Sequence, residues 1–133
     1  MFALELTGLT MGYFTGCSGL SASYDVVEKN TTDAKGNLAI TKIPGRLKFE
    51  DIVLKRGMTS DKSLQKWFTE FDGGKGERKD GSIVLYDRAG TEVARWDFKA
   101  GWPSKWSGGD LSSDSDDWMV EELTISHELL ERK

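Results

Sequence analysis

The side chains best suited to catalysis or metal binding are few in this sequence. His127 is its single histidine and Cys17 is its single cysteine. A cysteine nucleophile needs a base beside it, and a zinc site needs three or four ligands. A pair of Cys17 and His127 is conceivable, but no local motif supports it. We therefore expect no catalytic or metal-binding role for either residue, and we expect no cofactor.

Two further stretches have the composition of ligand-binding loops without their order. The acidic run at 110–117 contains four aspartates, but it lacks the glycine and the closing glutamate of an EF-hand calcium loop. The run Gly73-Gly74-Lys75-Gly76 lacks the Lys-Ser/Thr ending of a phosphate-binding loop and follows a predicted helix. We interpret both stretches as solvated loops. The sequence thus favours binding or assembly over catalysis.

The elements that position these residues are mostly short strands separated by turn-forming residues, such as Pro44-Gly45 and Arg88-Ala89-Gly90. This spacing predicts one domain over residues 1–133, built as an antiparallel β-sandwich or barrel with one α-helix. The strands are expected at Phe2–Thr7, Tyr13–Cys17, Leu20–Lys29, Leu38–Thr41, Arg46–Lys55, Ser82–Asp87, Glu92–Trp102 and Trp118–Leu129. Exposed loops are expected at Asn30–Asn37 and at 107–117.

Two of these strands have informative patterns. In Leu20–Lys29 the even positions are apolar and the odd positions are mostly polar, which predicts one covered face and one wet face. In Arg46–Lys55 the apolar phase changes in the middle. A β-bulge near Glu50-Asp51 is one explanation. The other is a strand that packs on the core at one end and on a neighbouring molecule at the other.

The helix is expected over Thr59–Phe71. Thr59, Ser60 and Asp61 are candidate N-cap residues, and Gly73-Gly74 gives a stop signal. One apolar face recurs at positions i, i+3, i+4 and i+7. We expect it to anchor the core through Leu64, Trp67, Phe68 and Phe71.

The composition and the apolar pattern of the sequence argue against several classes of protein. The net charge of −4 argues against a nucleic-acid-binding protein, which normally carries a basic surface. One cysteine excludes an internal disulfide and permits folding in a reducing compartment. The N-terminal residues have no basic segment followed by an apolar run, so no signal peptide is expected. No apolar run is long enough for a membrane helix, so no membrane anchor is expected.

Several segments, in order along nearly the whole chain, resemble the tail tube proteins of contractile phage tails and extracellular contractile injection systems. The similar segments are Gly12–Leu20 (GYFTGCSGL), Tyr24–Glu28, Ile43–Gly57 (IPGRLKFEDIVLKRG), Leu64 with Trp67-Phe68, Arg78–Ile83, Gly90–Trp96, Ala100–Gly108 (AGWPSKWSG) and Glu122–Glu128. Any one of these motifs is weak alone, but together they are specific.

The resemblance implies a structural subunit that is not an enzyme and shares its fold with the type VI secretion tube. It implies hexameric rings stacked into a hollow tube, with a contractile sheath, baseplate and cap as partners and protein or DNA as cargo. Assembly would take place in the bacterial cytoplasm, and the product would be a phage tail or an injection particle. A connector ring at the end of such a tube and a small monomeric ligand-binding β-barrel remain as alternatives.

The resemblance also gives roles to two sets of polar residues. A strand that lines a water-filled bore should present polar side chains to it, and the candidates are Ser21, Ser23, Asp25, Arg46, Lys48 and Glu50. In similar tube proteins the loop that corresponds to Asn30–Asn37 meets the next ring. We therefore expect inter-ring contacts from Thr31, Thr32, Asp33 and Lys35.

Overall fold

The computed structural model describes residues 1–108 and 119–133, so the acidic run at 110–117 lies outside the described residues. The helices are α1 (Ser63–Thr69) and the short 3₁₀ helix η1 (Asp72–Gly74). The strands are β1 (Phe2–Leu6), β2 (Leu9–Phe14), β3 (Gly16–Ser18), β4 (Ala22–Thr32), β5 (Leu38–Phe49), β6 (Ile52–Gly57), β7 (Lys79–Tyr86), β8 (Glu92–Ser107), β9 (Val120–Ser126) and β10 (Leu129–Arg132).

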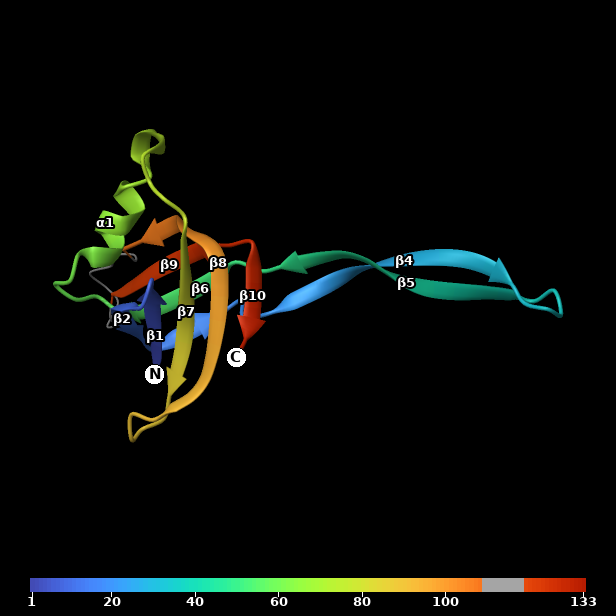
Figure 1. Ribbon diagram of the computed structural model, residues 1–133, viewed down its shortest axis with the longest axis horizontal. Coiled ribbons are helices and arrows are strands. Elements are labelled where there is room, and N and C mark those ends of the chain that lie inside the picture. The colour runs from blue at the N-terminus through green and yellow to red at the C-terminus, as the bar shows by residue number, and fades with distance from the viewer. Residues whose placement is uncertain (109–118) are drawn as a thin grey trace, which may run out of the picture.

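Antiparallel pairing divides these strands into a body and a separate hairpin. Among the described residues, the body is an eight-stranded sheet in the order β2-β1-β7-β8-β9-β6-β3, with β10 paired to β8. Strands β4 and β5 pair only with each other and extend away from the body (Figure 1). The prediction of a mostly antiparallel β fold with one α-helix is confirmed.

A bend in β8 lets the large sheet curve around its own core. The first part of β8 pairs with β7 and β10, and the part from Trp102 onward pairs with β9. At the bend Ala100 has a positive φ of 53°. Gly101 follows, where a side chain would overlap the ring of Phe98. The last strand, predicted over Trp118–Leu129, is in fact divided, because β9 ends at Ser126 and β10 continues to Arg132.

The core is formed by inward-facing apolar side chains from the strands of the body and from α1. These are Leu4, Leu6, Phe14, Ile52, Leu54, Leu64, Trp67, Ile83, Phe98, Leu123 and Ile125. Side chains on one face of a strand alternate with period two. Accordingly β6 and β9 each contribute alternate residues to this core.

The helix is shorter than its pattern predicts. Helix α1 begins at Ser63, and neither Thr59 nor Asp61 caps it. The Thr59 hydroxyl accepts a hydrogen bond from the Asp61 N–H, and the Asp61 carboxylate accepts one from the Ser63 N–H. These two bonds shape the turn before the helix. Of the predicted apolar face, Leu64 and Trp67 are buried, while Phe68 and Phe71 are only partly covered. Gly73 and Gly74 have positive φ and follow the end of α1.

At β5 one prediction is wrong, and of the two explanations offered for the change of apolar phase the β-bulge is excluded. Pro44-Gly45 is not a turn, because both residues lie within β5, and Pro44 stands opposite Val26 next to an irregularity in the register. Proline is tolerated at such irregular positions because no ladder hydrogen bond from its nitrogen is needed there. Glu50-Asp51 is not a bulge within one strand but the break between β5 in the hairpin and β6 in the body.

Candidate assembly surfaces

The hairpin of β4 and β5 is the most exposed part of the described chain. Every residue of β4 is exposed, as are most residues of β5. The predicted strand Leu20–Lys29 was expected to have a covered face, but the single subunit covers neither face of β4. Leu20 itself precedes β4 and packs against the core of the body. Within the described residues, no other element covers this hairpin.

The cross-strand register gives the hairpin one apolar face. Residues directly opposite each other in an antiparallel pair point to the same side. Tyr24 stands opposite Leu47, Val26 opposite Pro44, Asn30 opposite Ile40 and Thr32 opposite Leu38. We call the side of Tyr24, Val26, Leu38, Ile40, Pro44 and Leu47 the apolar face of the hairpin. These side chains are exposed to solvent, and the exposed fraction is 65% for Ile40 and 85% for Leu38.

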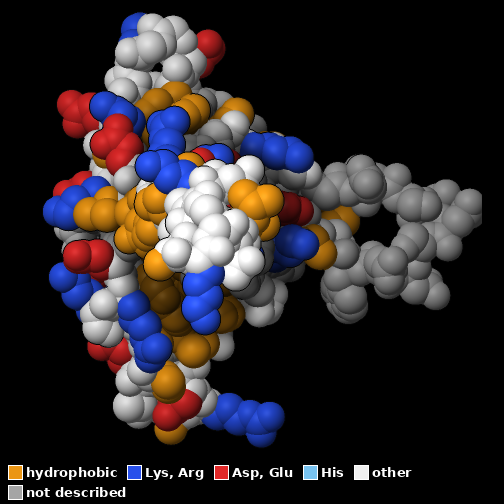
Figure 2. Space-filling view, turned by 90° about the vertical axis from the view of Figure 1, so that its right-hand side faces the viewer, with side chains coloured by type: hydrophobic (Ala, Val, Ile, Leu, Met, Phe, Trp, Pro, Cys, Tyr) orange, Lys and Arg blue, Asp and Glu red, His pale blue; other side chains and the backbone are white. Residues whose placement is uncertain are grey.

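A view from the end on which the hairpin projects shows hydrophobic side chains around it, most of them to its left and below it (Figure 2). Large exposed apolar surfaces of this kind mark sites of protein–protein contact. The apolar face therefore marks the hairpin as an assembly element.

The opposite face of the hairpin is mostly polar, although Val27 stands opposite Ile43 on it, and it contains most of the predicted bore-facing residues. Ser23 stands opposite Lys48, and Lys48 Nζ lies 3.1 Å from Asp25 Oδ1. Further out, the hydroxyls of Thr31 and Thr41 lie 3.3 Å apart.

At the root of the hairpin the other predicted bore-facing residues are also exposed. The Glu50 N–H donates to the Ser21 carbonyl, so these two residues lie opposite each other. Arg46 is exposed beside the irregularity in β5. The structure thus brings Ser23, Asp25 and Lys48 together, with Ser21 and Glu50 at the base of the same hairpin.

The tip of the hairpin is a short turn built on Asp33. The predicted loop Asn30–Asn37 is too long, because β4 includes Thr31 and Thr32 and β5 starts at Leu38. The Asp33 carboxylate accepts hydrogen bonds at 2.9 Å from the N–H groups of Lys35 and Asn37. These bonds, with that of Asn37 the strongest, hold the pKa of Asp33 below its ordinary value. The exposed tip therefore has a defined shape.

A buried ion pair that we did not predict joins two strands of the body. Arg56 on β6 stands opposite Glu121 on β9, and both side chains are buried. Arg56 Nη2 lies 3.4 Å from each carboxylate oxygen of Glu121, and the Trp106 indole N–H donates to the same carboxylate at 3.2 Å. The Arg56 guanidinium also lies 5.4 Å from the centre of the Phe14 ring.

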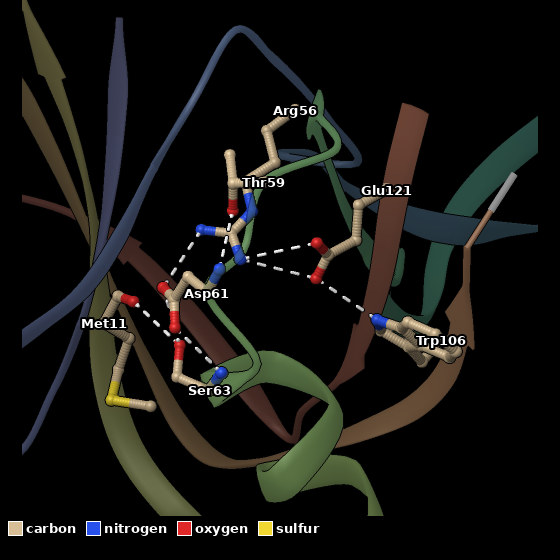
Figure 3. A network of polar contacts seen from close by, with 7 residues as sticks. All are labelled: Met11, Arg56, Thr59, Asp61, Ser63, Trp106 and Glu121. Atoms are coloured by element: carbon tan, nitrogen blue, oxygen red, sulfur yellow. Dashed lines mark hydrogen bonds and ion pairs between the residues drawn. The ribbon is translucent and has the colours of Figure 1, made fainter. Parts of the chain in front are cut away.

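This pair extends toward the start of α1, as Figure 3 shows. Arg56 Nη1 lies 3.6 Å from Asp61, which accepts hydrogen bonds from the N–H and the hydroxyl of Ser63. The Ser63 backbone bond is the largest of the causes that hold the pKa of Asp61 below its ordinary value. A buried charge is tolerated only when it is paired and hydrogen-bonded. The network therefore ties the start of the helix to the sheet.

Cys17 and His127 do not form a catalytic pair in the contacts of the described residues. Cys17 lies on β3, where burial raises the pKa of its thiol to about 11. The side chain packs against the core, and its thiol makes a weak polar contact at 4.0 Å to the Ser18 carbonyl. His127 contacts the Glu50 carbonyl and the rings of Phe49 and Phe98. A thiol with a raised pKa is a poor nucleophile.

Within the described ranges, 1–108 and 119–133, no group of three or more His, Cys, Asp or Glu side chains could hold a metal ion. No helix in these ranges is long and apolar enough to cross a membrane.

A β body with a projecting, partly apolar hairpin is typical of a subunit of a larger assembly. The sequence matches the family described as T4-like virus tail tube protein gp19 over residues 1–131, and the chain belongs to this family. No curated protein gives a sequence match.

Solved structures agree with this family. The chain is similar to a protein in the PVC sheath–tube complex of an extracellular contractile injection system, with a TM-score of 0.79, 26% identity and coverage of 99% of this chain and 87% of that one. A protein in the anti-feeding prophage tube-terminating cap gives a TM-score of 0.79, 25% identity and the same coverages of 99% and 87%. Hcp1 from Flavobacterium johnsoniae shares the fold, with a TM-score of 0.58, 22% identity and coverages of 99% and 94%.

These matches confirm the predicted function. The protein is a structural tube subunit, and it is a component of a phage tail or of an extracellular injection particle.

Proposed function

We propose that this subunit assembles into hexameric rings that stack into a hollow tube, and that it has no enzymatic activity. The observation that carries the proposal is the exposed apolar face of the hairpin, with Tyr24 and Val26 each 61% exposed. Neighbouring copies of the chain bury this face. A monomeric ligand-binding barrel would leave it in water, at the risk of aggregation. The ring number of six rests on the family resemblance.

In this proposal the two faces of the hairpin have different roles. The apolar face packs on neighbouring subunits, and the polar face of Ser23, Asp25 and Lys48 lines the bore, through which protein or DNA passes. The similar proteins come from a sheath–tube complex and from a tube-terminating cap. We infer the same surroundings for this chain: a contractile sheath outside, a baseplate and a cap at the ends, and assembly in the bacterial cytoplasm.

Negative-stain electron microscopy of the purified protein tests the proposal. Six-fold rings and tubes are the expected result. Light scattering that shows only monomers at high concentration, with no rings in the micrographs, would overturn it.

The hairpin tip is proposed to contact the next ring. Thr31 and Thr32 lie at the ends of the strand ladder, and Asp33 and Lys35 lie in the turn. Each contact is weak, but repetition around the ring makes stacking firm through avidity. Replacing 31–36 with a two-residue turn should preserve rings and abolish long tubes in micrographs. Normal tubes would exclude the tip from stacking, and loss of rings would place it in the lateral interface.

A further inference from the structure

The direction of the hairpin depends on very few contacts at its root. Among the described residues, β4 and β5 form a sheet of their own, so no ladder with the body fixes their orientation. At about 3.3 Å per residue, the 11 residues of β4 extend about 36 Å from the root. A tilt of about 10° there would move the tip by about 6 Å, more than the spacing of about 4.8 Å between paired strands. Assembly through the hairpin therefore requires a firmly held root.

His127 occupies the point where the hairpin joins the body. It lies in the break between β9 and β10. The imidazole centre is 5.9 Å from the ring of Phe49, the last residue of β5, and 6.2 Å from the ring of Phe98 in the core. This imidazole thus lies between an aromatic ring of the hairpin and one of the body.

The imidazole also makes a directional contact with the backbone. Its Nε2 lies 2.9 Å from the carbonyl oxygen of Glu50, the first residue after β5. A carbonyl oxygen only accepts hydrogen bonds, so Nε2 carries the proton. Nδ1 is buried and has no hydrogen-bond partner in the described chain. The His127 ring therefore makes one hydrogen bond in the described chain. That bond holds the Glu50 backbone carbonyl and does not involve the Glu50 side chain.

Two neighbouring contacts hold the same junction. The Ser126 hydroxyl lies 3.1 Å from the Asp51 carboxylate and 2.9 Å from the Ser104 hydroxyl. On the other leg, Gly19 has a φ of 84°, and a side chain there would overlap the Asp51 carbonyl. Both legs of the hairpin thus meet closely at Asp51, beside His127.

We propose that His127, assisted by Ser126, is a positioning residue that fixes the direction of the hairpin and thereby controls assembly of the subunit. The inference rests on the proposed function, because it gives the hairpin its role in joining subunits. It gives a structural role to the single histidine of the sequence. A phenylalanine would fill the same space between the two rings but could not hold the Glu50 carbonyl.

The test compares His127→Phe, which keeps ring packing, with His127→Gln, whose amide can still donate to the Glu50 carbonyl. Glu128→Gln is the control, since Glu128 is exposed and pairs with Arg78 instead. His127→Phe should melt near the unsubstituted protein but assemble about ten-fold less, the loss expected for about one hydrogen bond. His127→Gln should restore assembly. Equal assembly of all variants, or equal loss in His127→Phe and His127→Gln, would overturn the proposal.

Two further measurements keep the proposal separate from folding and from ring formation. If His127→Phe does not fold, Asp51→Ala removes the carboxylate that accepts the Ser126 hydrogen bond. This variant should weaken assembly in the folded protein, whereas unchanged assembly counts against the proposal.

If the unsubstituted chain forms no rings, the proposed function fails, but the junction between the hairpin and the body remains testable in dispersed subunits. Spin labels at Lys29→Cys and Lys66→Cys, on a Cys17→Ser background, should show a distance distribution that His127→Phe broadens. An unchanged distribution would overturn the proposal.

Discussion

In the body, Leu54 and Leu123 face each other across β6 and β9 and have no exposed surface, whereas in the hairpin Leu38 and Ile40 are 85% and 65% exposed. Both regions consist of antiparallel strands with alternating side chains. The body completes its core within one chain, with α1 covering the sheet. In the described residues the hairpin has an apolar face and no covering layer. If the hairpin joins subunits as we propose, substitutions in the body should affect stability and substitutions in the hairpin should affect assembly.

The largest effect on the body is expected from Trp67→Ala. Trp67 is 2% exposed in the core, and truncation of a buried aromatic side chain costs about 3–5 kcal/mol. The subunit should become insoluble or lose most of its thermal stability. The matched control is Phe68→Ala, because Phe68 is adjacent but only partly buried. An unchanged melting temperature for Trp67→Ala would show that α1 does not anchor the body.

Arg56→Met should destabilise the body by a similar amount, because it leaves Glu121 buried without its positive partner. Removing one member of a buried ion pair costs about 3–5 kcal/mol. Replacing both members, as in Arg56→Met with Glu121→Leu, should recover most of the loss in a urea denaturation experiment. If the double variant is as unstable as the single one, shape at this site matters more than charge.

A substitution in the hairpin should reduce assembly and leave the stability of the subunit nearly unchanged. Ile40→Asp places a charge on the apolar face, where Ile40 is 65% exposed in the described structure. We expect a nearly unchanged melting temperature at low concentration, and complete loss of rings in light scattering. Thr41→Asp is the control, because its position alternates to the polar face. Equal damage from both substitutions would remove the distinction between the two faces.

The smallest effect is expected from pH at the start of α1. The pKa of Asp61 is lowered mainly by the Ser63 hydrogen bonds. Its contribution to stability is therefore complete above the ordinary aspartate value of about 3.9 and is lost as pH falls through the lowered pKa. Asp61→Asn should be slightly less stable than the unsubstituted protein at pH 7, and the difference should shrink in acid. A difference that persists at pH values below both pKa values would point to another cause.

Much of the fold could be predicted from the sequence because alternation and helical periodicity are local signals. The projection of the hairpin could not, because a strand whose apolar face is covered by another molecule has the same pattern as one covered by its own chain. The change of phase near Glu50-Asp51 did carry this information, since β5 leaves the body there. A single phase change does not tell a bulge from a break between sheets.

The buried ion pair had a signal that we did not use. Arg56 shares its parity with Ile52 and Leu54, and Glu121 shares its parity with Leu123 and Ile125. A charged residue on the inward side of each of two strands, with opposite signs, indicates a buried pair. The start of α1 was predicted too early because Thr59 and Asp61 have the residue types of N-caps, yet their side chains organise the preceding turn.

The half-buried position of Cys17 on β3 has a consequence for the redox behaviour of the assembled particle. With a pKa of about 11, only about one thiol in ten thousand is ionised at pH 7, compared with a few per cent for an ordinary cysteine. Disulfide formation and oxidation proceed through the thiolate. In a tube exposed to an oxidising medium outside the cell, this thiol would therefore be oxidised more slowly than an ordinary surface cysteine.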